Sequence, residues 1–198
     1  MIRRAGSRPI APAQLEEDEV RARYLKELER DMDRELMRQC RLIYSCTAVA
    51  LKRSYNWEKR GILKLLDLTE EIWKECGSTI LKSLVQMLDE ETGVEIQRGD
   101  GKSWRDLVYL NAEQAVGYMT KEKWTYMRVQ QKKWVAPQVT AGILLALHRK
   151  CGFDSDRIAE TYARILEVEE EVEYKEDRAI ALCSEETLVD IVEEGKRK

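Results

Sequence analysis

Residues 13–55 contain neither glycine nor proline, and this uninterrupted stretch limits the fold more than any other feature of the chain. Within it, apolar side chains recur at helical spacing, at Leu25, Leu28, Met32, Leu36, Ile43 and Ala50. Side chains at such intervals lie on one face of an α-helix, and the preceding Pro12 suits a first helical turn. We therefore expect one helix over residues 13–55, roughly 60 Å long at about 1.5 Å per residue.

The apolar pattern of this stretch changes along its length. Its first half is mostly charged and carries one narrow apolar stripe. Its second half is apolar on nearly all sides, at Leu42, Ile43, Tyr44, Cys46, Ala48, Val49 and Leu51. Because a helix that is apolar all round is normally buried, the second half should lie in the core while the first half projects. The narrow stripe on the projecting half predicts a homo-oligomer.

The remainder of the chain is also typical of helices. Charged residues make up 36% of the sequence, and glycine and proline are scarce, so strands should be rare. The predicted fold class is all-α, with a long N-terminal helix followed by shorter helices at about 57–75, 78–91, 111–134, 138–150, 155–174 and 185–194. Pro137 should separate the fourth helix from the fifth, and Ser184 should cap the seventh.

A weak internal repeat is visible in the sequence. Residues 50–53 (ALKR) recur as residues 146–149 (ALHR), at an offset of 96. Residues 90–96 (EETGVEI) resemble residues 185–191 (EETLVDI), at an offset of 95. The two matches keep the same order and spacing, which indicates an internal duplication; chance similarity between helical stretches is the alternative.

This repeat predicts two related three-helix units, over residues 41–96 and 138–191. The expected division of the whole chain has four parts. They are a disordered tail, the long helix with the first unit, a loop, and the second unit with its acidic C-terminal third, over residues 1–11, 12–96, 97–103 and 104–198.

The second unit carries a short motif, Ala146-Leu147-His148 followed by Gly152-Phe153 and a helix. In this respect the chain resembles uncharacterised small helical proteins carried by prophages and mobile elements of Gram-positive bacteria. The resemblance covers about fifty residues. It implies a phage or mobile-element setting and no active site.

The cysteines and the N-terminus indicate the cellular compartment. The five cysteines, Cys40, Cys46, Cys76, Cys151 and Cys183, include no Cys-x-x-Cys spacing, so we expect reduced thiols. No apolar segment follows the N-terminal arginines, and no stretch reaches the length of a membrane span. We expect a cytoplasmic protein with no membrane partner.

Charge is unevenly distributed although the net charge is only −3. Residues 121–134 carry a local charge of +4, with Lys121, Arg128 and Lys132 on one helical stripe. Trp124 and Trp134 lie nearby, and basic residues interleaved with aromatic ones can bind nucleic acid. The alternative interpretation is that both tryptophans are core residues and the lysines are merely solvated.

The C-terminal third is strongly acidic, with a local charge of −11 over residues 154–194. Its candidate partner-binding residues are Glu167, Glu170, Glu171 and Asp177. An acidic helical surface can occupy the nucleic-acid channel of another protein. We therefore expect a non-enzymatic module that binds a protein partner through the projecting first helix or the acidic C-terminal third. Its sharper form is an inhibitor of a host nuclease or defence complex. A nucleic-acid-binding regulator that uses residues 121–134 is the alternative.

Three short patterns resemble catalytic or cofactor motifs but are better explained structurally. His148 and Cys151 are three residues apart, yet Cys151 should end a helix, where the dipole disfavours a thiolate. Residues 173–175 (EYK) lack the strands that nuclease sites of this form require. Residues 101–103 (GKS) match only the end of a phosphate-binding loop. We expect no enzyme activity, no metal and no cofactor.

Overall fold

The computed structural model describes residues 12–76, 80–96 and 121–191. Its helices are α1 (Pro12–Tyr55), α2 (Lys59–Cys76), α3 (Ile80–Thr92), α5 (Lys121–Cys151), α6 (Ser155–Glu171) and α7 (Glu176–Thr187). These described ranges contain six helices and no strand, so the predicted all-α fold class is confirmed. The predicted tail over 1–11 and the loop over 97–103 lie outside them.

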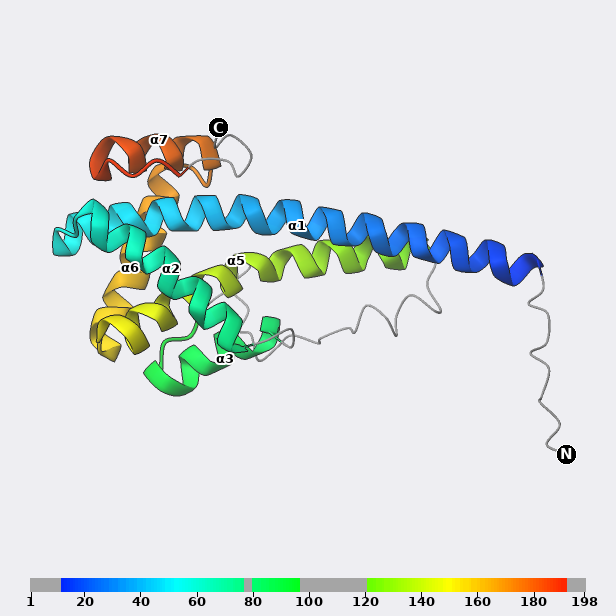
Figure 1. Ribbon diagram of the computed structural model, residues 1–198, viewed down its shortest axis with the longest axis horizontal. Helices are drawn as coiled ribbons and strands as arrows, with labels where there is room; N and C mark the ends of the chain where they lie inside the picture. The colour runs from blue at the N-terminus through cyan, green and yellow to red at the C-terminus, as the bar shows by residue number, and fades with distance from the viewer. Residues whose placement is uncertain (1–11, 77–79, 97–120, 192–198) are drawn as a thin grey trace, which may run out of the picture.

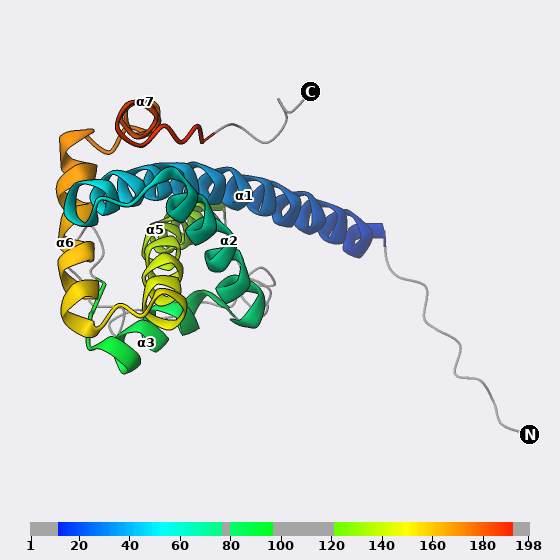
Figure 2. The same cartoon turned by 60° about the vertical axis from the view of Figure 1, so that its left-hand side comes forward.

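The long N-terminal helix is present almost as predicted. From Leu42 to Leu51 every side chain is buried except Tyr44, which is half-buried. The N-terminal end of α1 extends beyond the other helices (Figures 1 and 2). The change from a charged, narrowly striped half to an all-apolar half therefore marks the point where α1 enters the core.

The two long helices form the centre of the molecule, and each is covered by the helices that follow the other. α1 and α5 lie side by side and run in the same direction (Figure 1). α6 and α7 follow α5 in the chain but pack on α1, while α2 and α3 follow α1 but pack on α5 (Figure 2). The core is thus built almost entirely from contacts between distant segments.

α5 corrects one sequence prediction, because Pro137 lies inside this helix and does not end it. Proline in a helix interior removes one backbone hydrogen bond and costs about 3 kcal/mol. Pro137 itself is buried, and every residue from Gln138 to Leu147 is buried between the neighbouring helices. The apolar burial of this segment offsets the local cost. Residues 111–120 of the predicted fourth helix lie outside the described part of the chain.

The C-terminal helix also differs from its prediction. α6 ends at Glu171, three residues before the predicted end, and α7 spans 176–187 instead of 185–194. The connection turns at Glu173 and Tyr174, both with a φ of 55°, a region that non-glycine residues seldom adopt. Ser184 is therefore no helix cap; it lies in the last turn of α7, where its hydroxyl donates to Asp190 over 2.8 Å.

Many local features recur 95 or 96 residues apart in the structure. The buried positions of α2 are Ile62, Leu65, Thr69 and Ile72, and those of α6 are Ile158, Thr161, Ile165 and Val168. All four pairs are offset by 96. α3 and α7 end alike, at Gly93 and at Leu188, which both have a positive φ and are offset by 95. The same burial pattern and the same helix ends therefore follow each long helix.

The contact between α2 and α5 gives a test of the packing. A Cβ atom on Gly142 would lie well inside van der Waals distance of Nε1 of Trp73, a buried atom with no hydrogen-bond partner among the described residues. Gly142→Ala should therefore lower the free energy of unfolding by about 1–3 kcal/mol, because the indole must move. Chemical denaturation measures the loss.

Gly61→Ala is the matched control. Its Cβ would meet Trp57 at an ordinary 3.4 Å, so this change should stabilise the helix by up to about 1 kcal/mol. Equal effects of the two substitutions would contradict the described packing of Trp73 against α5.

Candidate protein-interaction surface

The acidic surface lies on α6 and α7, which cover α1 on the outside of the molecule (Figure 2). Residues 154–191 contain thirteen acidic and four basic side chains, a local charge of −9. α1 supplies two further cations, Arg41 and Arg53, which pair with acids of α6 and α7. A considerable excess of negative charge therefore remains on these two helices.

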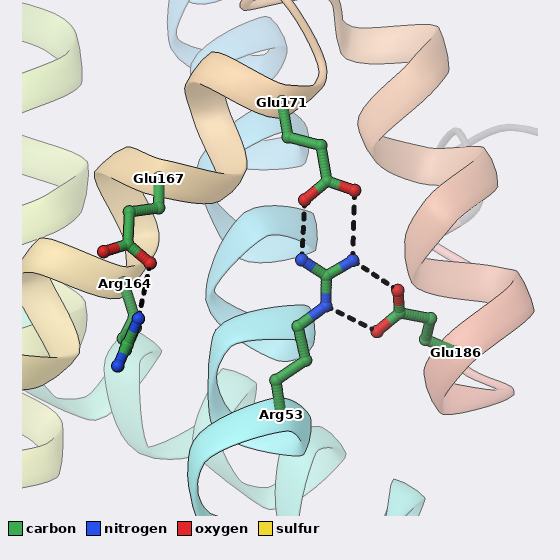
Figure 3. Close-up of polar contacts among 5 residues, drawn as sticks. All are labelled: Arg53, Arg164, Glu167, Glu171 and Glu186. Carbon is green, nitrogen blue, oxygen red and sulfur yellow. Dashed lines mark hydrogen bonds and ion pairs between the residues drawn. The ribbon is translucent and has the colours of Figure 1, made fainter.

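Arg53 fixes the two acidic helices to the end of α1 (Figure 3). Its guanidinium donates to both carboxylate oxygens of Glu171, over 2.6 and 3.1 Å, and to both of Glu186, over 2.5 and 3.0 Å. The hydrogen bonds from Arg53 hold the pKa of Glu171 below its usual value. Glu171, a predicted partner-binding residue, is thus held in an exposed ion-pair cluster that joins α1, α6 and α7.

The other three predicted residues are exposed and do not pair with Arg53. Glu167 is exposed and accepts a 2.7 Å hydrogen bond from Arg164 of the same helix (Figure 3). Such an exposed pair is weak and can be exchanged for a partner's charge. Glu170 and Asp177 are exposed and form no ion pair with any residue that the structure describes. They are the most available carboxylates of the predicted set.

The sequence prediction missed Glu169, which differs from its acidic neighbours. Its side chain is largely buried on α6, and this burial raises the pKa of Glu169 to about 7. Glu169 lies four residues after the buried Ile165, so helical periodicity alone assigns it to the inner face of α6. At neutral pH it therefore exchanges a proton and is not a permanent surface charge.

The alternative basic surface is only partly described. Lys121, Trp124, Arg128 and Trp134 belong to α5, but their side chains lie outside the described part of the structure. Lys132 is half-buried, and its Nζ lies 4.0 Å from a carboxylate oxygen of Asp31 on α1. Lys132 therefore contacts the acidic side of a neighbouring helix.

The other candidate motifs show structural contacts. Nδ1 of His148 donates to the backbone carbonyl of Phe153 over 2.7 Å, at the end of α5. Burial raises the pKa of the Cys151 thiol, which disfavours a nucleophilic thiolate there. Glu173 pairs with Lys175 and Arg178 in the turn between α6 and α7. The GKS segment at 101–103 lies outside the described residues.

Two general searches cover the same described ranges. Within them, no three histidine, cysteine or acidic side chains come together as a possible metal site. None of the helices described is both long enough and apolar enough to span a bilayer. No protein-family model, curated protein or solved structure matches the chain. Function is therefore inferred from the residues themselves.

Glu169 makes the stability of the fold depend on pH. Because its pKa is raised from 4.5 to about 7 in the folded state, the folded protein binds a proton more readily than the unfolded chain. This contribution is fully present below pH 4.5 and is lost as the pH rises through about 7. Glu169→Gln should remove that dependence, worth up to about 3 kcal/mol, and should stabilise the protein above pH 7.

Urea denaturation between pH 5 and pH 8 measures this effect. Glu170→Gln removes the same charge from the exposed face of α6 and should leave the wild-type profile unchanged. Parallel profiles for all three proteins would show that Glu169 ionises as freely as a solvated carboxylate.

Proposed function

We propose that this chain is a non-enzymatic protein-interaction module that binds a basic surface of its partner through α6 and α7. The observation that carries the proposal is the exposure of Glu170 and Asp177, which have no ion pair within the described ranges while nearby acids are held by arginines. Carboxylates on helices that are already packed present their charge without a further cost of ordering the backbone. Such charges chiefly accelerate encounter with an oppositely charged protein.

The sharper form of the proposal is an inhibitor from a phage or mobile element, acting in the cytoplasm on a host nuclease or defence complex. The support is the local charge of −9 over residues 154–191, whose two helices cover one side of the molecule (Figure 2). A surface of this kind competes with nucleic acid for a basic channel. Self-association through the projecting half of α1 is part of the same proposal, since its charged pattern leaves one apolar stripe.

We also propose that residues 41–96 and 138–191 are duplicated units. Two arginine clusters support this, one at the end of each long helix. Arg53 of α1 binds Glu171 and Glu186, while Arg149 of α5 binds Glu91 and lies 4.0 Å from Glu75. The offsets are 96 between the arginines, 96 between Glu75 and Glu171, and 95 between Glu91 and Glu186. A whole cluster is therefore repeated along with the core pattern.

If the two clusters have equivalent roles, their removal should have equivalent costs. Arg53→Gln and Arg149→Gln should each lower the free energy of unfolding by about 1 kcal/mol, the upper range for partly exposed ion pairs. Because the clusters lie on different helices, the double variant should show the sum of the two losses.

Arg164→Gln removes an arginine whose partner is in the same helix, so it should change stability little. Thermal and urea denaturation of the four variants provide the comparison. A large loss for one cluster together with none for the other would count against structurally equivalent units.

The interaction proposal is tested by a charge reversal and a matched control. Glu170→Lys/Asp177→Lys changes the net charge by +4 on α6 and α7, and Glu58→Lys/Asp67→Lys makes the same change at exposed positions at the start of α2 and within it. Tagged wild type and both variants are used to recover partners from a bacterial lysate, with identification by mass spectrometry.

We expect the wild type and the α2 control to recover the same protein, and the α6–α7 variant to lose it. With the purified partner, the variant should associate at least about tenfold more slowly at low salt. Equal recovery by all three proteins would refute the acidic surface. Salt-sensitive DNA or RNA binding that is lost in Lys121→Glu/Arg128→Glu/Lys132→Glu would instead favour the basic surface.

A further inference from the structure

A small hollow lies between the start of α2 and the end of α5. Its volume is about 240 Å³, and it is lined by Trp57, Gly61, Lys64, Leu68, Lys150 and Cys151. Ligand pockets for drug-sized molecules usually span about 300–1,000 Å³. A hollow of this size therefore suits a single ring.

The residues offset by 96 from those around the hollow form an equivalent site, which we call the filled site because side chains of the protein itself occupy it. There the Tyr55 ring packs edge-on against Phe153, with ring centroids 5.2 Å apart. The Arg157 guanidinium lies over both rings, 4.1 Å from the centroid of Phe153 and 5.0 Å from that of Tyr55. An aromatic ring and a guanidinium thus occupy the space against Phe153.

Two small residues leave the hollow open. Cys151 stands where the filled site has Tyr55, and Gly61 stands where it has Arg157, both at an offset of 96. Gly61 lies in α2 without a positive φ, so the backbone does not require glycine there. A Cβ atom at Gly61 would meet the ring of Trp57, the counterpart of Phe153, at 3.4 Å. The aromatic wall is therefore retained, while the two side chains that fill the space are absent.

The charge at the polar end of the hollow is reversed. In the filled site, the hydroxyl of Tyr55 donates to Glu160 over 3.1 Å. The counterpart of Glu160 is Lys64, which is exposed and has no ion pair within the described ranges. The second cation, Lys150, is already paired with Glu75 over 2.8 Å. A ring in the open site therefore meets an available cation where the Tyr55 ring meets a carboxylate.

We propose that this hollow binds a small molecule with one aromatic ring and one carboxylate. The ring occupies the space between Trp57 and Leu68 that corresponds to the position of Tyr55 in the filled site. The carboxylate pairs with Lys64. An edge-on ring contact contributes about 0.5–1.5 kcal/mol beyond its burial, and the charged contact selects the acid over neutral analogues. This site is separate from the acidic surface and does not depend on the partner proposed for it.

The test uses 4-hydroxyphenylacetate as the probe and 4-hydroxyphenylacetamide as its neutral match. The full-length protein is labelled with 5-fluorotryptophan, and Trp57→Phe assigns the signal of Trp57. We expect a saturable shift of that signal with a Kd of about 1 mM, as is reasonable for a single ring, and about two- to fivefold weaker binding of the amide, the range for an exposed ion pair.

Three variants and one control separate the ring site from the charge. Gly61→Arg and Cys151→Tyr each place the residue of the filled site in the hollow, and each should abolish binding while circular dichroism stays helical. Lys64→Gln should weaken binding of the acid by about two- to fivefold but leave binding of the amide unchanged. Lys59→Gln removes an exposed cation that does not line the hollow and should have no effect.

Gly61→Arg should also raise the melting temperature, because it replaces a helical glycine. The proposal is overturned if the wild-type Trp57 signal shows no saturable shift. It is equally overturned if the acid binds both filled variants as tightly as the wild type, or if acid and amide bind with equal affinity.

Discussion

The fold depends on burying two long helices that are apolar on nearly every face where they enter the core. The second half of α1 and the segment of α5 from Gln138 to Leu147 each need neighbours all round. Short helices connected directly to a long helix cover only part of it. Each long helix is instead covered by the short helices that follow the other one: α6 and α7 pack on α1, and α2 and α3 pack on α5. Neither half has a complete core alone.

The arginines at the ends of these helices follow from the same arrangement. Arg53 and Arg149 emerge where each long helix leaves the core, and each reaches carboxylates on helices that belong to the other half of the chain. Because these pairs are partly exposed, they contribute modestly to stability but fix the position of the covering helices. Glu171 is used in this way, whereas the preceding residue, Glu170, remains available for a partner.

Periodicity predicted most of the helices but not all of their ends. The ends of α2 and α3 could be predicted because a glycine follows each helix. Tyr174 and Leu188 also have a positive φ, but neither is a glycine, so the sequence does not mark these turns. The acidic run around Glu173 therefore did not mark the boundary between α6 and α7, and the start of α7 was predicted nine residues too late. The repeat contained the correct answer, since an offset of 95 from α3 places a helix at 175–187. Pro137 was wrongly predicted to separate two helices, because the free-energy cost of a proline inside a helix is outweighed here by the burial of the residues around it.

The sequence by itself determined the helical class, the extent of α1 and the excess of acid in the last third, because periodicity, backbone propensity and charge are local properties. Only the tertiary structure decided which acids are free, since that depends on whether Arg53 lies within reach of Glu171 or Glu170. It also decided that Glu169 is buried enough to bind a proton near neutral pH, and that Gly61 and Cys151 face one hollow. These outcomes arise from contacts between residues far apart in the chain. Periodicity places Glu169 on the inner face of α6, but it does not say how deeply the carboxylate is buried.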